Sequence, residues 1–273
     1  MNYKISELET IAKKIRGKVI EMSYKSRASH LGSSLSCVDI LVAIYWAVLT
    51  IDPSNPSDPD RDRFILSKGH AASAIYTTLA FRGFFSHAIL DSYATAGSCL
   101  EEHPGPIYVP GIEAATGSLG HGLSIGIGMA LSSRIQKQSY KTFVLLGDGE
   151  CNEGSVWEAA MFASAHSLKN LIAIIDFNKW QATGRSCEIM ALQPFKEKWK
   201  SFGWNSYEID GHDMNTLVNK LRDISYKNDK PTAVVAHTIK GKGVSFMEDD
   251  NNWHYRIPTQ EEVIMSKKEL GLI

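Results

Sequence analysis

The sequence has almost no net charge, few cysteines and no long hydrophobic run. Its 29 Lys and Arg residues balance 30 Asp and Glu residues and are scattered, which argues against a nucleic-acid-binding protein. The longest apolar stretch, 40–48, is too short to cross a bilayer, and the first residues show no secretory pattern. The four cysteines (Cys37, Cys99, Cys151 and Cys187) form no CxxC pair. We therefore expect free thiols, a cytoplasmic location and no membrane or nucleic-acid partner.

Two short apolar runs in the middle of the sequence end in polar residues. The first, 143–147, leads into Gly147-Asp148-Gly149, and the second, 171–177, leads into Asn178. Runs of this kind are typical of buried parallel strands, whose carboxyl ends face ligands in open α/β sheets. Asp148 and Asn178 lie about 30 residues apart, the length that a strand, a crossover helix and a second strand need. We therefore expect the two side chains to lie together at one edge of a sheet.

A carboxylate and an amide oxygen at the same sheet edge favour a hard cation such as Mg²⁺. This ion prefers oxygen ligands and usually shares its coordination shell with the phosphates of a bound ligand. The alternative is a glycine turn followed by an unrelated Asn, because short motifs often match by chance. The position of both residues at predicted strand ends favours the metal site.

The remaining patterns predict an α/β fold, with a central, mostly parallel sheet and helices on both faces. We expect one domain over 1–273, with a helical N-terminal extension and a loop-rich C-terminal tail from Lys240. Strands are expected at 60–67, 143–147, 171–178 and 231–239. Helices are expected at 6–29, 37–49, from 71 to about 83, 117–136, 155–168, 191–202, 215–226 and after 259, with a break at 29–34 and irregular chain at 94–116.

A series of motifs runs along the whole chain. They are Ser29-His30-Leu31-Gly32, Ser67-Lys68-Gly69-His70, His103-Pro104, Pro110-Gly111-Ile112-Glu113, Thr116-Gly117-Ser118-Leu119-Gly120, Gly147-Asp148-Gly149 with Asn178, and Lys240-Gly241-Lys242-Gly243 with His254. In this order the set resembles the N-terminal half of a transketolase, which has a thiamine diphosphate-binding fold and binds the diphosphate end of the cofactor. Full-length transketolases continue into a pyrimidine-binding domain. The sequence thus resembles the N-terminal subunit of a split transketolase.

The resemblance implies thiamine diphosphate and Mg²⁺ as cofactors, with Ca²⁺ or Mn²⁺ as substitutes for the metal. It places the metal on the side chains of Asp148 and Asn178 and on the backbone carbonyl of Trp180, where many relatives have an aliphatic residue or Gln. It implies further cofactor contacts by the following residues: His70, Gly117, Ser118, Leu119, Gly147, Asp148, Gly149, Glu150, Asn178 and His254. For the glycine-rich turn at 117–122, close helix packing is an alternative role, and the two roles are compatible.

Four histidines stand within the matched motifs. The resemblance puts His30, His103 and His254 at the substrate oxygens as catalytic residues, and His70 and His254 at the diphosphate. Histidine suits this work because its ordinary pKa lies near neutral pH. The alternative for each is a surface histidine or a hydrogen-bonded core histidine. His121 stands where relatives often have Gln, and we do not expect it to be catalytic.

Glu153 follows Gly-Asp-Gly closely. By resemblance it lies at the contact with the partner half, near the glutamate of that half which activates the aminopyrimidine of the cofactor. The alternative is a carboxylate that favours the N-terminus of the next helix through the helix dipole. Both roles are compatible with one position.

The sequence therefore predicts part of an enzyme that transfers a two-carbon ketol unit from a ketose (phosphate) to an aldose (phosphate). Its partner is expected to be a C-terminal transketolase subunit with the pyrimidine-binding domain, in an α2β2 assembly. One alternative is a related thiamine diphosphate enzyme, of the deoxyxylulose-phosphate synthase or 2-oxo-acid dehydrogenase type. Another is a non-catalytic cofactor-binding protein.

Overall fold

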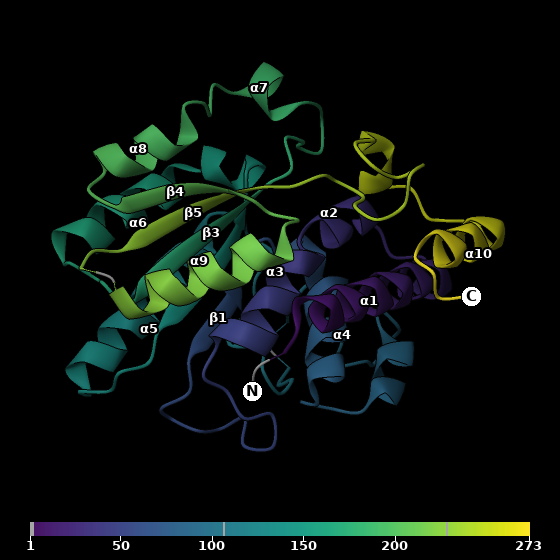
Figure 1. Ribbon diagram of the computed structural model, residues 1–273, viewed down its shortest axis with the longest axis horizontal. Coiled ribbons are helices and arrows are strands. Elements are labelled where there is room, and N and C mark those ends of the chain that lie inside the picture. Colours follow the sequence, from purple (N-terminus) through teal and green to yellow (C-terminus); the bar gives the residue numbers. More distant parts are fainter. Residues whose placement is uncertain (1–2, 106, 228) are drawn as a thin grey trace.

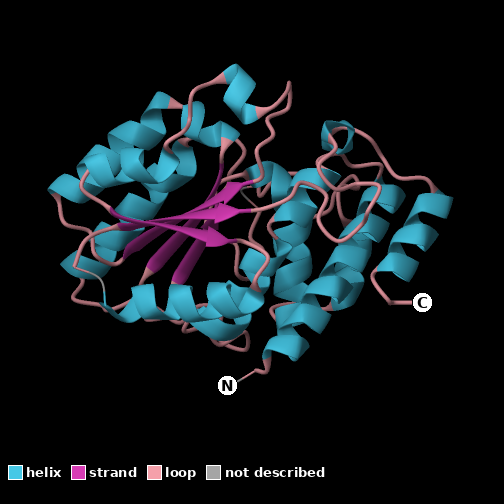
Figure 2. Cartoon of the chain, turned by 45° about the horizontal axis from the view of Figure 1, so that its top comes forward, coloured by secondary structure: helices cyan, strands magenta, loops and turns pink. Residues whose placement is uncertain are grey.

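A parallel sheet forms the centre of the molecule. The computed structural model describes residues 3–105, 107–227 and 229–273, and in this part of the chain five strands pair in the order β1-β2-β3-β5-β4. Every neighbouring pair is parallel. The strands are β1 (Arg63–Leu66), β2 (Thr142–Gly147), β3 (Leu171–Phe177), β4 (Asn205–Asp210) and β5 (Thr232–His237). Helices lie on both sides of the sheet, which confirms the predicted α/β fold (Figures 1 and 2).

Two groups of helices share a hydrophobic core with opposite faces of the sheet. The first group is α1 (Ile5–Ser26), α2 (Leu31–Ser36), α3 (Val38–Ala43) with a π-helical turn (Ile44–Val48), α4 (Ala72–Arg82) and α9 (Met214–Lys227). The second group is α5 (His121–Ile135), α6 (Gly154–Ala165) and α8 (Phe195–Ser201). The short helix α7 (Ser186–Ile189) follows β3, and α10 (Gln260–Glu269) lies beside α1 (Figure 1). None of the helices in the described ranges is both long and apolar enough to cross a membrane.

Alternate residues of the central strands point into the two cores. Phe143 and Leu145 of β2 belong to the α1 side, whereas Val144 and Leu146 belong to the α5 side. All of β2 and β3 is buried, so these strands are almost entirely apolar in the sequence. Because β2 and β3 are parallel neighbours, their carboxyl ends lie at the same edge of the sheet, where Asp148 and Asn178 follow them.

Most strand and helix predictions agree with the structure, but α7 was not predicted and the helix expected at 191–202 begins only at Phe195. Three further differences have clear physical reasons. Strand β4 was not predicted, because it lies at the edge of the sheet and buries only Ile209 among its six residues. Helix α2 forms where we expected a break, because the whole of this short segment is buried and Leu31 and Leu35 join the hydrophobic core. The helix expected at 37–49 is instead α3 followed by the π-helical turn.

A buried cluster of three charged or polar side chains joins α1, α3 and the loop after β4. Both oxygens of Asp39 accept hydrogen bonds from Arg16, at 2.9 and 2.7 Å. His212 Nε2 accepts from the backbone N–H of Ile239, so Nδ1 carries the proton that it donates to Asp39 at 2.8 Å. Burial alone raises the pKa of Asp39, but the charges and hydrogen bonds of Arg16 and His212 together outweigh burial and hold that pKa well below its ordinary value.

Replacing Asp39 is expected to destabilise the fold strongly. Asp39→Ala leaves the Arg16 guanidinium buried without a counter-charge, which typically costs about 3–5 kcal/mol. Because the folded pKa is lowered, the contribution of Asp39 is present above pH ~4, the ordinary pKa of the unfolded group, and is lost as the pH falls further. Urea unfolding at pH 7 and pH 3 measures both effects. The exposed Asp60→Ala is the matched control, and equal midpoints for the two variants at pH 7 would contradict this account.

Candidate functional site

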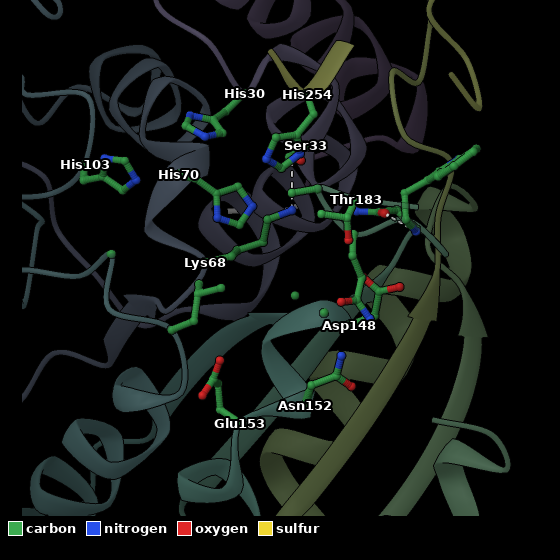
Figure 3. Close-up of a pocket in the computed structure, with 18 residues that line it drawn as sticks. His30, Ser33, Lys68, His70, His103, Asp148, Asn152, Glu153, Thr183 and His254 are labelled. Atoms are coloured by element: carbon green, nitrogen blue, oxygen red, sulfur yellow. Dashed lines mark hydrogen bonds between the residues drawn. The ribbon is translucent and has the colours of Figure 1, made fainter. Parts of the chain in front are cut away.

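A cavity of about 430 Å³ opens at the carboxyl edge of the sheet (Figure 3). Its walls come from the ends of β2 and β3, the loop before α5, the start of α2 and the C-terminal segment near His254. The lining residues are His30, Ser33, Lys68, His70, His103, Gly117, Leu119, Gly147, Asp148, Gly149, Asn152, Glu153, Asn178, Trp180, Gln181, Ala182, Thr183 and His254. Residues more than two hundred positions apart thus meet in one cavity.

Asp148 follows β2 and is almost completely buried beneath the cavity. Its Oδ2 atom accepts hydrogen bonds from the backbone N–H of Lys179 at 3.0 Å and from Ser186 Oγ at 2.7 Å. Burial raises the pKa of Asp148 to about 6. A carboxylate in this position is costly to keep charged, and a bound cation would remove that cost.

Asn178 follows β3 and lines the same cavity, as the spacing of the two motifs predicted. Its Oδ1 atom accepts from the backbone N–H of Trp180 at 3.0 Å, and this bond fixes the amide within the loop 178–186. The possible metal ligands here are a carboxylate, an amide oxygen and backbone carbonyls, and these oxygen ligands suit Mg²⁺ better than a soft metal. Nearby, Asn152 Oδ1 and Gln181 Nε2 line the cavity buried and without a partner among the described residues, which suits a polar ligand.

The four predicted histidines lie around one side of the cavity (Figure 3). The ring centroid of His30 lies 5.5 Å from that of His70, 5.6 Å from that of His103 and 5.0 Å from that of His254. Burial lowers the pKa of His30 and His70, and it lowers that of His254 to about 3 with help from the charge of Lys240. These three rings are therefore neutral at pH 7, and each offers one hydrogen-bond donor and one acceptor.

A family model described as "Transketolase, thiamine diphosphate binding domain" matches residues 8–273. The chain belongs to the transketolase family. It is 43% identical over 267 residues to one subunit of an apulose-4-phosphate transketolase of Phocaeicola vulgatus, covering 98% of this chain and 95% of that protein. It is 40% identical to one subunit of a 6-deoxy-6-sulfo-D-fructose transketolase of a Clostridium species, covering 93% of each chain. The crystal structure of a Campylobacter jejuni transketolase superposes with a TM-score of 0.92 at 28% identity, covering 99% of this chain and 43% of that one.

These findings confirm the resemblance drawn from the motifs. The chain is a transketolase-type N-terminal subunit with the fold that binds thiamine diphosphate. The cavity at the ends of β2 and β3 is the candidate site for the cofactor's diphosphate and its Mg²⁺ in this transketolase subunit. The role of each individual residue stays a prediction, and the structure shows only which of these residues line the cavity.

Two of the predicted cofactor residues lie outside the cavity lining of this transketolase subunit. Ser118 is exposed, and Glu150 is buried behind the glycine turns. The Glu150 carboxylate accepts from Ser67 Oγ and from the backbone N–H groups of Gly120 at 2.9 Å and Gly147 at 3.0 Å. Glu150 thus holds the two turns that line the cavity, and its oxygens are already occupied.

The turn before α5 serves both of the roles considered for it. Gly117 and Leu119 line the cavity, while Gly122 and Gly126 pack against β1 and β2 so closely that an added Cβ would lie 2.2 Å from Ser67 Oγ and 2.6 Å from Val144 Cγ2. Glu153 lies exposed at the cavity wall, immediately before α6. Glu153 therefore lies at the N-terminus of α6, as the alternative role requires. Its exposure at the cavity wall is also compatible with a partner contact, which stays a prediction.

Sequence reasoning missed two buried lysines that belong to the quoted motifs. Lys68 Nζ pairs with Asp176 and donates to the carbonyl of Ser33 at 2.9 Å, beneath the cavity. Lys240 Nζ lies 3.1 Å from His254 Nδ1, and burial, followed by the charge of Lys68, lowers the pKa of Lys240 to about 8. The signal that could have found the first pair is Asp176 inside the otherwise apolar strand β3, because a buried carboxylate needs a cationic partner.

Proposed function

We propose that this chain, together with a second subunit, transfers a two-carbon ketol unit from a ketose (phosphate) donor to an aldose (phosphate) acceptor. The observation that carries the proposal is the shared cavity of Asp148, Asn178 and the four histidines, on a chain that matches proteins named as transketolase subunits over nearly its whole length. Thiamine diphosphate, when bound, supplies the nucleophilic carbon for breaking and forming a carbon–carbon bond next to a carbonyl.

The metal and the diphosphate belong at the strand ends. We assign Mg²⁺ to Asp148, Asn178 and the backbone carbonyl of Trp180, and the diphosphate to the region between them and His70. The buried carboxylate and the amide oxygen supply hard ligands, and the cation offsets the cost of burying Asp148. Gly149 adjoins Asp148 without a side chain, so a phosphate can approach the backbone there.

Three of the four histidines are proposed to bind the sugar substrate. We assign His30, His103 and His254 to the hydroxyl and carbonyl oxygens of the substrate, where an imidazole can take part in hydrogen bonds and proton transfer. Two relatives are named for apulose-4-phosphate and for 6-deoxy-6-sulfo-D-fructose. Both names describe a sugar with an anionic group, so we propose a sugar phosphate or a similarly anionic sugar as the substrate class.

The partner is proposed to be a C-terminal transketolase subunit that brings the pyrimidine-binding domain and its activating glutamate. Two relatives of nearly the same length are named as one subunit of a transketolase, which supports a second chain, as does the exposed Glu153 at the cavity wall. Two copies of each chain in an α2β2 assembly suit closed symmetry. We propose a cytoplasmic assembly, in keeping with the four free cysteines.

A reconstitution assay tests the proposal. This chain, its partner and their mixture are each incubated with thiamine diphosphate, Mg²⁺, a ketose phosphate donor and an aldose phosphate acceptor. We expect ketol transfer in the mixture alone, together with a mass that matches two copies of each chain. Full transfer by this chain without a partner would contradict the proposed division of the site.

A further inference from the structure

The side chain of Trp180 has no part in the site as assigned so far, since only its backbone carbonyl is placed on the metal. The indole nevertheless has a specific partner. Its Nε1–H donates to Asp249 Oδ1 at 2.8 Å. Arg185 donates to both oxygens of the same carboxylate, at 2.6 and 2.7 Å, and its guanidinium carbon lies 3.8 Å from the centroid of the Trp180 ring. Both ends of the loop that holds the proposed metal ligands therefore converge on one carboxylate.

A second contact joins the same two segments. Asn251 Nδ2 donates to the carbonyl of Ala182 at 3.1 Å, and Asn251 Oδ1 accepts from Lys240 Nζ at 2.6 Å. The backbone N–H of Asp249 donates to the carbonyl of Lys240 at 2.8 Å. The loop 178–186 is thus tied to the segment 240–254, which carries His254 on the other side of the cavity.

We propose that Asp249 is a positioning residue that holds the loop 178–186 in the shape required for metal binding. The proposal rests on the proposed function of this cavity and adds to it a residue that does not contact the metal. Asp249 would act through Trp180 and Arg185, so that the Trp180 carbonyl and the Asn178 amide are already in place when Mg²⁺ arrives.

The geometry favours this role over an ordinary surface ion pair. The side chains of Arg185 and Asp249 are 32% and 55% exposed, and an isolated exposed pair adds little to stability. Here, however, the pair is bidentate, stacked on an indole and shared with the indole N–H, so its geometry is fixed. The backbone φ angles of Lys179 and Asp249 are 69° and 59°, values that residues other than glycine rarely adopt. Contacts with the rest of the structure must therefore hold the backbone of both segments in this conformation.

The test uses Asp249→Asn in the assembled complex of the two chains. Asn tolerates the positive φ and can still accept from the indole, but it lacks the charge and the bidentate pairing with Arg185. We expect the apparent Kd for Mg²⁺, measured by titration with thiamine diphosphate present, to rise by about tenfold or more. At saturating Mg²⁺ and cofactor, kcat should stay within about twofold of the wild type, because Asp249 does not touch the substrate.

A matched control and a second readout separate positioning from general stability. Glu248→Gln removes the adjacent charge, whose partners are Lys242 and the backbone of Gly243, and it should leave Mg²⁺ affinity unchanged. Trypsin digestion of the metal-free complex should cut faster after Lys179 and Arg185 in Asp249→Asn than in Glu248→Gln. Trp180→Phe, which removes the indole N–H but keeps an aromatic ring, should also raise the Kd for Mg²⁺.

The outcomes distinguish this proposal from the proposed function. If Asp148→Ala abolishes Mg²⁺-dependent cofactor binding while Asp249→Asn titrates like Glu248→Gln, Asp249 is not a positioning residue and the metal site stands. Faster trypsin cleavage with unchanged Mg²⁺ affinity would likewise overturn the positioning role. If Asp148→Ala itself leaves binding unchanged, the metal site is wrong and the proposal falls with it.

Discussion

Asp148→Ala is expected to abolish Mg²⁺-dependent binding of thiamine diphosphate while leaving the chain folded. The variant removes the only carboxylate among the three proposed metal ligands, and a neutral site holds a divalent cation poorly. Calorimetric titration of the assembled complex with thiamine diphosphate, with and without Mg²⁺, measures the loss. Cofactor affinity equal to that of the wild type would remove Asp148 from the metal site.

The same residue is expected to weaken the metal-free fold. The folded pKa of Asp148 is about 6 against an ordinary value of 3.8, so the unfolded chain loses its proton first. Stability from this group is therefore present below pH ~4 and is lost as the pH rises to ~6. Asp148→Asn keeps an oxygen for the Lys179 and Ser186 bonds and should stabilise the metal-free protein at pH 7.5 by about 3 kcal/mol.

Thermal unfolding of the metal-free complex tests whether Asp148→Asn raises or lowers its stability. The melting temperature of Asp148→Asn should exceed that of the wild type at pH 7.5, and the difference should shrink as the pH falls toward 4. Saturating Mg²⁺ and thiamine diphosphate should reverse the order, because only the wild type gains stability from binding. A lower melting temperature for Asp148→Asn in the metal-free state at pH 7.5 would contradict the account.

His30→Ala and His103→Ala are expected to slow turnover by roughly 10²–10⁴-fold with smaller effects on cofactor binding. Both rings line the cavity on the side assigned to the sugar, and the His30 ring lies between those of His103 and His254, with a contact to each. His70→Ala is expected to weaken cofactor binding clearly, because His70 belongs to the diphosphate side. The exposed His121 is the matched control, since its ring lies 3.2 Å from the nearby carbonyl of Leu119 and does not line the cavity.

Steady-state rates and cofactor titrations on the four variants separate these roles. His30→Ala and His103→Ala should show a low kcat with near-normal cofactor affinity. His70→Ala should show mainly a weaker affinity for the cofactor, and His121→Ala should behave like the wild type. Wild-type turnover in His30→Ala and His103→Ala would exclude them from the substrate site.

The parts of the site that were predictable from sequence are those whose spacing follows the strands. Asp148 and Asn178 each end a buried apolar strand, so their meeting at one edge follows from the length of a crossover. The edge strand β4 was missed because a strand that buries only one residue has no such pattern. Helix α2 was missed because a six-residue segment is too short to show a helical period.

Contacts between distant side chains were beyond the reach of the sequence. The pairing of Lys68 with Asp176 and the convergence of Trp180 and Arg185 on Asp249 depend on rotamers and on loops that meet only in the folded chain. Motif position did identify which residues would gather, but it did not show that Glu150 is committed to the turns at Gly120 and Gly147. Its hydrogen bonds, rather than its place beside Asp148, decide what it does.

The most direct test of the central claim follows the carbons of the donor sugar. A ketose phosphate labelled with carbon-13 at C1 and C2 is incubated with the mixed subunits, thiamine diphosphate, Mg²⁺ and an unlabelled aldose phosphate, and the products are identified by NMR. The account predicts that both labelled carbons arrive together, still bonded to each other, as C1 and C2 of the new ketose. If no labelled ketose forms in the mixture, while a 2-oxo acid offered in its place loses carbon dioxide, the transketolase function proposed for this chain is wrong.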